Sequence, residues 1–314
     1  MRILITGAQG LIGRAVVKGL VSEGLSLTCL SRREIPKSTN GVRWIKGDLV
    51  EQGVAEKVIE GQDAIVHLAH DSTPLTTSSD LIADARRSLF PSLQLIQAIV
   101  QSGHKPHVIY LSSGGAVYGG SAKDRRRYHE TDVCAPVMAY GIQKLTVERY
   151  LHYAAENGSL RSTVLRVSNA YGDLLPAERM QGLIGTSISR ILTGKPLRLI
   201  GNPLNVRDYV HISDVVAAVR KALNLVCDFE IINIGSGIGY SVIDVLELIS
   251  RVSGNGVPIL REEVAGSGLL PNWCVLDVSK ARNILAWEAN VSLEDGIAAM
   301  FAKAQKRNAN LVTI

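Results

Sequence analysis

The chain has 314 residues, which is enough for one large α/β domain or two closely associated lobes. Its hydrophobic content of 46% and charged content of 20% are ordinary for a globular enzyme and exclude a disordered or fibrous chain. The formal net charge is +5, but the basic residues are scattered apart from one run at 125–127, which favours a solvated loop over a nucleic-acid patch. A mildly basic protein suits an anionic substrate.

The cysteines and the N-terminus indicate a cytoplasmic protein. The four cysteines lie far apart without a C-x-x-C pair, so the sequence predicts neither a zinc site nor a disulfide framework, and no bound metal. The first apolar run meets Gly7 after a few residues, which is too soon for a signal peptide. No segment reaches the length of a transmembrane helix. We therefore expect a cytoplasmic protein with no membrane or nucleic-acid partner.

Strand and helix patterns alternate from the first residue. A buried strand over residues 2–6 leads into a glycine turn and a helix over 11–23. Continuous apolar strands separated by helical patterns indicate a parallel sheet that is covered on both faces. Further strands are predicted over 25–30, 42–46, 63–68, 107–111 and 163–167, with long helices over 81–101 and 140–157.

Beyond about residue 171 the alternation loosens, which predicts a smaller lobe. The expected fold is α/β, with a Rossmann-type doubly wound parallel sheet over 1–170 and a smaller C-terminal α/β substrate-binding lobe over 171–314, parts of which cross back to the sheet. Ligands of such sheets bind at the carboxyl ends of the strands, where the strand order reverses. In the lobe we expect strands over 197–200 and 231–234 and helices over 181–192, 213–223, 242–253 and 293–306.

The segment 7–13 is typical of a dinucleotide-binding turn, because it lies directly between the first strand and the first helix. Its glycines permit a tight turn, close approach to a pyrophosphate and close helix–sheet packing. The helix N-terminus then offers free N–H donors and a partial positive charge. The residues expected to bind the cofactor here are Gly7, Gln9, Gly10, Leu11, Ile12 and Gly13.

The end of the second strand bears on the choice between NADP and NAD. An acidic residue there would favour the free 2′-hydroxyl of NAD. The strand ends instead in Ser31, Arg32 and Arg33, and arginine pairs with phosphate through a charge-assisted fork. NADP is therefore preferred over NAD, and arginines stacked on adenine or solvated are the alternative. Asp48, after the third strand, is placed to accept a hydrogen bond from the adenine amino group.

Tyr140 and Lys144 are four residues apart and so lie on one helical face. An ammonium beside a phenol stabilises the phenolate, and we expect it to lower the pKa of Tyr140 from about 10. Such a tyrosine can exchange a proton with a substrate hydroxyl while a nicotinamide takes or gives a hydride. The pair follows the strand that ends in Ser112 and Ser113 at the distance this chemistry requires.

At this point the sequence resembles the extended short-chain dehydrogenases, specifically the NAD(P)-dependent sugar-nucleotide epimerase/dehydratase group, over nearly its whole length. The resemblance rests on the glycine turn, the Tyr140/Lys144 pair and later motifs that simple dinucleotide binders lack. The other matching segments are 47–49 (GDL), 67–69 (HLA), 112–119 (SSGGAVYG), 165–172 (LRVSNAYG), 206–212 (VRDYVHI) and 233–237 (NIGSG).

The resemblance implies a role for each matching position. Tyr140 would be the acid/base, Lys144 would hold the ribose hydroxyls, and Asn169 would contact the diphosphate of a nucleotide-sugar substrate. Arg207 and Asp208 would order the substrate lobe, with a salt-bridged loop joining the lobes as the alternative. The matching residues expected to contact the cofactor are Asp48, Leu49, Leu68 and Ala69.

The sequence departs from the family pattern at three places. The hydroxyl that assists the tyrosine normally lies at the position of Gly114, so Ser113 is preferred here and Ser112 is the alternative. The Thr-Asp-Glu set of dehydratases is replaced by Gly-Gly-Ala at 114–116, which argues against a 4,6-dehydratase. The diphosphate-binding arginine of many epimerases has no clear match in 261–273, where only Arg261 is a candidate.

Three functions remain. The first is a 4-epimerase that acts on a nucleotide-linked sugar through a transient 4-keto intermediate. The second is an NADPH-dependent 4-ketosugar-nucleotide reductase, which the strand end at 31–33 favours. The third is a non-catalytic NADP-sensing regulator, disfavoured because such proteins usually lose the tyrosine–lysine pair. By analogy with the family, the helices over 81–101 and 140–157 predict a homodimer with a four-helix interface, and polysaccharide biosynthesis is the expected setting.

Overall fold

The computed structural model describes residues 1–36, 41–73, 80–119, 125–174, 182–254, 256–262 and 272–312. Its centre is a seven-stranded sheet in which every neighbouring pair is parallel, in the order β10-β6-β5-β4-β1-β2-β3. The order reverses between β1 and β4, which makes the carboxyl ends of these two strands the switch point where ligands bind. The strands are β1 (Arg2–Thr6), β2 (Ser26–Ser31), β3 (Val42–Lys46), β4 (Ala64–His67), β5 (His107–Ser113), β6 (Arg161–Val167) and β10 (Phe229–Ile234).

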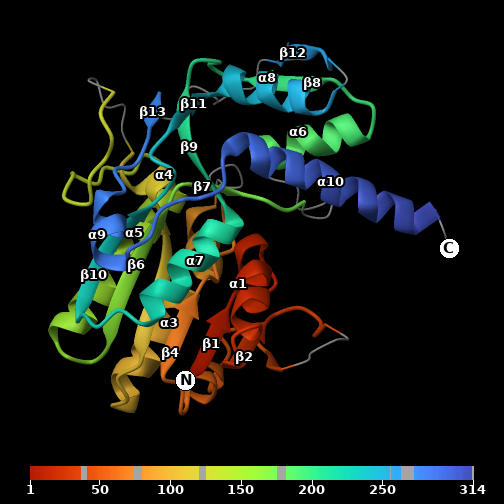
Figure 1. The fold of residues 1–314 in the computed structure, drawn as a ribbon. Helices are drawn as coiled ribbons and strands as arrows, with labels where there is room; N and C mark the ends of the chain where they lie inside the picture. Colours follow the sequence, from red (N-terminus) through yellow and green to blue (C-terminus); the bar gives the residue numbers. More distant parts are fainter. Residues whose placement is uncertain are drawn as a thin grey trace.

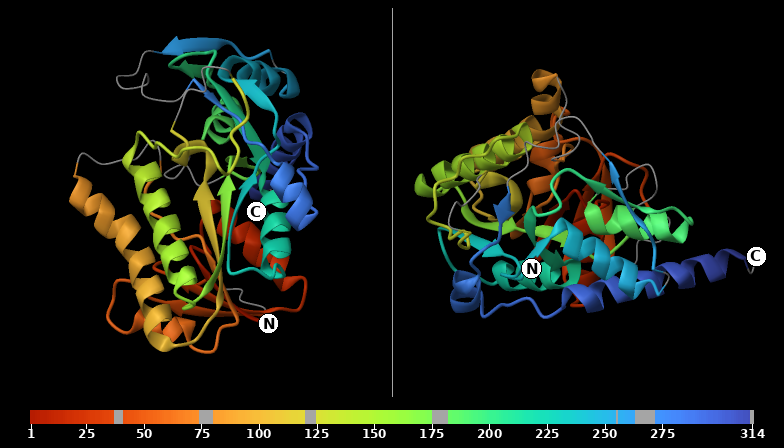
Figure 2. Two further views of the ribbon diagram at one scale, coloured as in Figure 1. Left: turned by 90° about the vertical axis from the view of Figure 1, so that its left-hand side faces the viewer. Right: turned by 90° about the horizontal axis from the view of Figure 1, so that it is seen from above.

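Both faces of the sheet are covered, as the continuous apolar strands predicted. Because side chains alternate along a strand, Ile3 and Ile5 enter one core cluster and Leu4 enters the other. One cluster packs under α1 (Leu11–Val21), α7 (Ile212–Leu223) and α9 (Ser279–Leu285). The opposite cluster packs under α2 (Val54–Ile59), α3 (Leu81–Ser102) and α5 (Ala139–Glu156). Figures 1 and 2 show the two helical layers on either side of the sheet.

A second group of smaller elements lies beyond the carboxyl ends of the strands (Figure 1). It contains a four-stranded sheet of β7 (Asn169–Tyr171), β9 (Val206–His211), β11 (Gly239–Ser241) and β13 (Trp273–Cys274), and a pair of β8 (Leu197–Ile200) and β12 (Ile259–Glu262). Its helices are α6 (Leu183–Leu192), α8 (Val242–Val252) and α10 (Leu293–Val312), and a short α4 (Gly114–Val117) follows β5.

The chain passes back and forth between the two groups. After β9 it returns to the large sheet as α7 and β10, and after β13 it returns again as α9. The division into two domains at residue 170 stays a prediction. The helix predicted to begin at Gln181 begins at Leu183, and Gln181 itself lies outside the described residues. The sequence patterns missed the short helices α2 and α9 because each spans only two turns or less.

Candidate active site

The glycine turn packs against the end of β4. Gly7 has φ +68, and a Cβ there would lie 2.7 Å from Ala69 N and 2.8 Å from the Leu68 carbonyl carbon. A Cβ on Gly13 would lie 2.2 Å from Gly7 O, so the first turn of α1 also requires glycine. Gly10 is the N-cap of α1 and uses no side-chain cap. The first N–H groups of α1 are therefore left for a ligand, and this cradle fits a dinucleotide pyrophosphate.

In the region predicted to bind the adenosine of the cofactor, two carboxylates lie beside Arg32. The Arg32 guanidinium lies 2.5 Å from Asp71 and 3.7 Å from Asp48. Both pairs are partly exposed to solvent. Ser31 Oγ accepts from Arg33 N at 3.0 Å and so shapes the turn after β2. The sequence did not single out Asp71, although its place four residues after the end of β4 puts it at the same edge of the sheet.

The predicted catalytic pair, Tyr140 and Lys144, lies in the first turns of α5. Tyr140 is half-buried, and Lys144, one turn later, is buried, with its Nζ donating to Leu111 O at 2.8 Å. Burial lowers the pKa of Lys144 to about 7, while Glu148 acts to raise it. Burial raises the pKa of Tyr140, and a side-chain hydrogen bond with Ser113 partly opposes this.

The predicted lowering of the Tyr140 pKa is therefore wrong for this fold. The Lys144 ammonium is 5.9 Å from the centroid of the Tyr140 ring and is directed to a backbone carbonyl. At that separation the loss of hydration of the phenolate outweighs the attraction of the ammonium.

The three residues 112–114 have different surroundings. Ser113 meets the Tyr140 phenol, as described above. Ser112 is buried and donates its hydroxyl to the Glu148 carboxylate. A Cβ on Gly114 would lie 2.6 Å from Leu276 Cδ1 and 3.1 Å from Arg166 O, so a side chain at this position would require Leu276 to shift. The contacts favour Ser113 as the hydroxyl partner of Tyr140.

A buried polar network lies behind Tyr140 and Lys144, and the sequence did not reveal it. Glu148 of α5 and Arg166 of β6 form an ion pair of 2.7 Å with side chains only 2% exposed. Arg166 Nη1 also donates to Tyr118 OH at 3.0 Å, and that hydroxyl donates to Asn233 Oδ1 at 2.7 Å. The one signal in the sequence is the position of Glu148, four residues after Lys144 on the same helical face.

The residues predicted for the substrate side are held by the backbone of the smaller lobe. Asn169 Nδ2 donates to Asp208 O at 2.9 Å, and Arg207 Nη1 donates to Val206 O at 2.8 Å. The fully buried Asp208 carboxylate accepts from the backbone N–H groups of Ser236, at 2.8 Å, and of Gly237, at 3.1 Å.

These contacts bear on the two interpretations of Arg207 and Asp208. Neither side chain forms an ion pair in the described part of the chain, so the contacts favour ordering of the lobe over a salt-bridged loop. Of the stretch 261–273, residues 263–271 lie outside the description. Arg261 lies on β12, which pairs with β8 of the smaller lobe.

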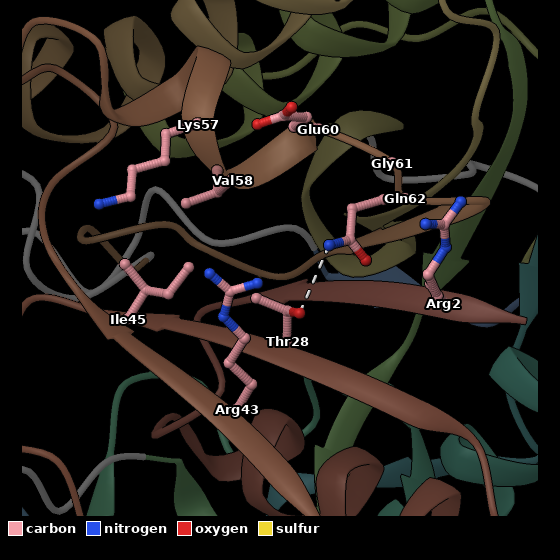
Figure 3. Close-up of a pocket in the computed structure, with 9 residues that line it drawn as sticks. All are labelled: Arg2, Thr28, Arg43, Ile45, Lys57, Val58, Glu60, Gly61 and Gln62. Atoms are coloured by element: carbon pink, nitrogen blue, oxygen red, sulfur yellow. Dashed lines mark hydrogen bonds between the residues drawn. The ribbon is translucent and has the colours of Figure 1, made fainter.

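A separate pocket of about 350 Å³ opens at the opposite, amino-terminal edge of the sheet (Figure 3). Arg2 at the start of β1, Arg43 near the start of β3 and Lys57 of α2 line it. None of the residues predicted for the cofactor or substrate lies here. Within the described ranges, no three or more His, Cys, Asp or Glu side chains gather as metal ligands, and none of the helices combines the length and apolar character of a membrane span.

The doubly wound sheet, the glycine cradle and the Tyr140/Lys144 pair define a dinucleotide-dependent enzyme of the dehydrogenase type. The chain belongs to the NAD dependent epimerase/dehydratase family, whose model matches residues 3–235. The predicted family, fold class, enzyme class and nicotinamide dinucleotide cofactor are thereby confirmed.

Relatives and solved structures span almost the whole chain. The dTDP-4-dehydro-6-deoxyglucose reductase of Escherichia coli is 27% identical over 306 residues, covering 94% of this chain and 95% of the relative. The UDP-glucose 4-epimerase of Thermotoga maritima, solved with UDP-glucose, is 28% identical with a TM-score of 0.89, covering 98% of this chain and all of that one. The NAD complex of the Thermus thermophilus UDP-glucose 4-epimerase is 26% identical, with a TM-score of 0.86 and coverage of 97% and 99%.

Proposed function

We propose that the protein is an epimerase that inverts C4 of a nucleotide-diphosphate sugar. The observation that carries this proposal is the half-buried Tyr140 beside Ser113 and Lys144 at the switch point of the sheet, next to the glycine cradle. The similarity to the T. maritima 4-epimerase over 98% of the chain supports the same substrate class.

The side chains divide the proton chemistry between them. Tyr140 must be the phenolate to accept the proton of the C4 hydroxyl, and as the phenol it later returns that proton. Ser113 hydrogen bonds to the Tyr140 oxygen and to the sugar oxygen. Lys144 supplies positive charge behind the phenol and hydrogen bonds to the ribose hydroxyls. When bound, a nicotinamide would supply a reversible hydride acceptor for C4 of the sugar. Gly115 and Ala116 supply no acid or base, so loss of water from the 4-keto sugar is not expected.

The cofactor-binding residues follow from the cradle. The N–H groups at the start of α1 hold the pyrophosphate, with Gly7 and Gly13 allowing its close approach. Ser31, Arg32 and Arg33 favour the 2′-phosphate of NADP over the hydroxyl of NAD. Asp48 lies beside Arg32, where it can both orient that arginine and accept from adenine.

A reductase is the second candidate, because the strand end at Ser31 to Arg33 suits NADPH and the E. coli relative is a reductase. The two are separated by incubating the purified protein with a panel of sugar nucleotides without added cofactor. An epimerase interconverts the C4 epimers with no net change in the absorbance of reduced nicotinamide. Strict dependence on stoichiometric NADPH would contradict the epimerase.

We also propose a homodimer formed through α3 and α5, which pack against each other. Their outer surface exposes apolar side chains that a second copy would cover, which fits a four-helix interface. The largest of these are Leu81, Ile82, Phe90, Ile142, Tyr150 and Tyr153. Sedimentation of the purified protein tests this, and a monomer at micromolar concentration would contradict it.

A further inference from the structure

His70 lies beside the catalytic tyrosine and has no part in the proton chemistry above. It follows β4 directly after Leu68 and Ala69, which pack on the glycine turn. Its ring meets the Tyr140 ring edge-on, with centroids 5.1 Å apart and an interplanar angle of 78°. We propose that His70 is a further binding residue of this site, which donates a hydrogen bond from Nδ1 to a sugar oxygen.

One ring nitrogen of His70 lacks a partner among the described residues. His70 Nδ1 is buried and has no hydrogen-bond partner among the described residues, whereas Nε2 meets Ser72 Oγ at 3.2 Å. His67, three residues earlier, provides an internal comparison. Its Nδ1 meets Thr6 Oγ1 at 2.7 Å and its Nε2 meets Ser92 Oγ at 2.8 Å. Buried polar atoms normally have partners, so the unpaired Nδ1 of His70 indicates a group that binds there.

The neighbouring serines determine which nitrogen carries the hydrogen. Ser88 Oγ accepts from Ser72 N at 3.1 Å and donates to Ser72 Oγ at 3.2 Å. The Ser72 hydroxyl hydrogen is then free to donate to His70 Nε2, which leaves the hydrogen of a neutral ring on Nδ1. Burial and the nearby Lys144 lower the pKa of His70 to about 2, so the ring stays neutral, with Nδ1 as its donor and Nε2 as its acceptor.

The position of His70 selects the class of ligand. β4 lies between β1, which ends in the glycine turn, and β5, which ends in Ser113. An N–H group between the pyrophosphate cradle and the catalytic phenol faces sugar oxygens, which come from the ribose of the dinucleotide or from the hexose of the substrate. The hexose source rests on the proposed function, whereas the ribose source rests only on the family's cofactor.

The test compares three substitutions by calorimetry. His70→Phe keeps an aromatic ring against Tyr140 but removes the donor, and His70→Asn restores a donor close to the Nδ1 position. His104→Phe, on an exposed residue at the opposite edge of the sheet, is the matched control. One arm titrates NADP⁺ and NAD⁺ into the protein, and the other titrates UDP-glucose into the protein loaded with cofactor. Thermal melts of each variant show that it is folded.

We expect His70→Phe to weaken binding about tenfold in one arm, as loss of one buried hydrogen bond would. His70→Asn should recover most of that loss, and His104→Phe should match the wild type. A loss in the cofactor arm assigns the ribose, and a loss in the UDP-glucose arm assigns the hexose. Unchanged binding by His70→Phe in both arms, or equal losses for Phe and Asn, would overturn the proposal. If the wild type binds no UDP-glucose, that result counts against the proposed function and not against His70. The cofactor titration alone then tests the role of His70.

Discussion

Two arginine–carboxylate pairs at the same edge of the sheet differ in their exposure to water. The side chains of the Arg166–Glu148 pair, between β6 and α5, are each 2% exposed, whereas those of the Arg32–Asp71 pair, at the predicted adenosine site, are 47% and 37% exposed. Breaking a buried ion pair is costly, because the charge that remains is neither paired nor hydrated. An exposed pair is screened and can exchange its partner for a ligand. The first pair therefore belongs to the framework of the site, and the second is available for cofactor recognition.

The largest effect is expected from breaking the buried pair. Arg166→Met leaves Glu148 as an uncompensated buried charge and should lower the free energy of unfolding by about 3–5 kcal/mol. Arg32→Met should change it by about 1 kcal/mol or less, because the exposed pair contributes little. Urea unfolding of both variants measures the contrast, and equal losses would contradict the distinction between the two pairs.

A pH-dependent effect is expected from Lys144, which neighbours the buried pair. Its pKa in the folded protein, about 7, lies below the unfolded value of 10.5, so the unfolded chain binds more protons between these values. The penalty for the buried ammonium is therefore full below pH 7 and is relieved as the pH rises. The stability of the wild type relative to Lys144→Met should rise between pH 7 and pH 10. A difference that stays flat over this range would show that Lys144 is not desolvated.

A smaller effect is expected at the turn next to the buried pair. Gly114→Ser places a hydroxyl at the position that the family resemblance implies for it, but its Cβ meets Leu276 and the Arg166 carbonyl. We expect a loss of stability of about 1–3 kcal/mol, as is usual for overpacking, and no gain in turnover. Thermal melts and initial rates check this. Faster turnover with unchanged stability would mean that Ser113 is not the partner of Tyr140.

The smallest effect is expected at the exposed pair. Asp71→Asn removes a carboxylate from Arg32 and should strengthen the preference for NADP. The ratio of the NAD dissociation constant to the NADP dissociation constant should rise by about two- to fivefold. The shift should shrink as the salt concentration rises, because the charges are exposed to solvent. Fluorescence titrations at two salt concentrations measure it, and a shift toward NAD would reverse the role given to Asp71.

The sequence could predict the sheet and the placement of Tyr140 and Lys144 on one helix because each depends on local spacing. Apolar runs fixed the strands of the large sheet, and the four-residue spacing of Tyr140 and Lys144 fixed their common helical face. The direction of the Tyr140 pKa was missed because it depends on burial, which spacing does not reveal. The partners of Glu148 were missed because they come from other elements, including Ser112 of β5 and Arg166 of β6. The choice between Ser112 and Ser113 likewise needed the fold, since adjacent residues of a strand point to opposite faces.

The central claim is that Tyr140 moves the proton while hydride leaves C4 of a sugar nucleotide. The most direct measurement follows UDP-glucose and its C4 epimer by nuclear magnetic resonance with the wild type and with Tyr140→Phe, alongside the cofactor affinity of each. The account predicts a rate that falls by about a hundredfold to ten-thousandfold in the variant, with cofactor binding nearly unchanged. Turnover by Tyr140→Phe at the wild-type rate would contradict it.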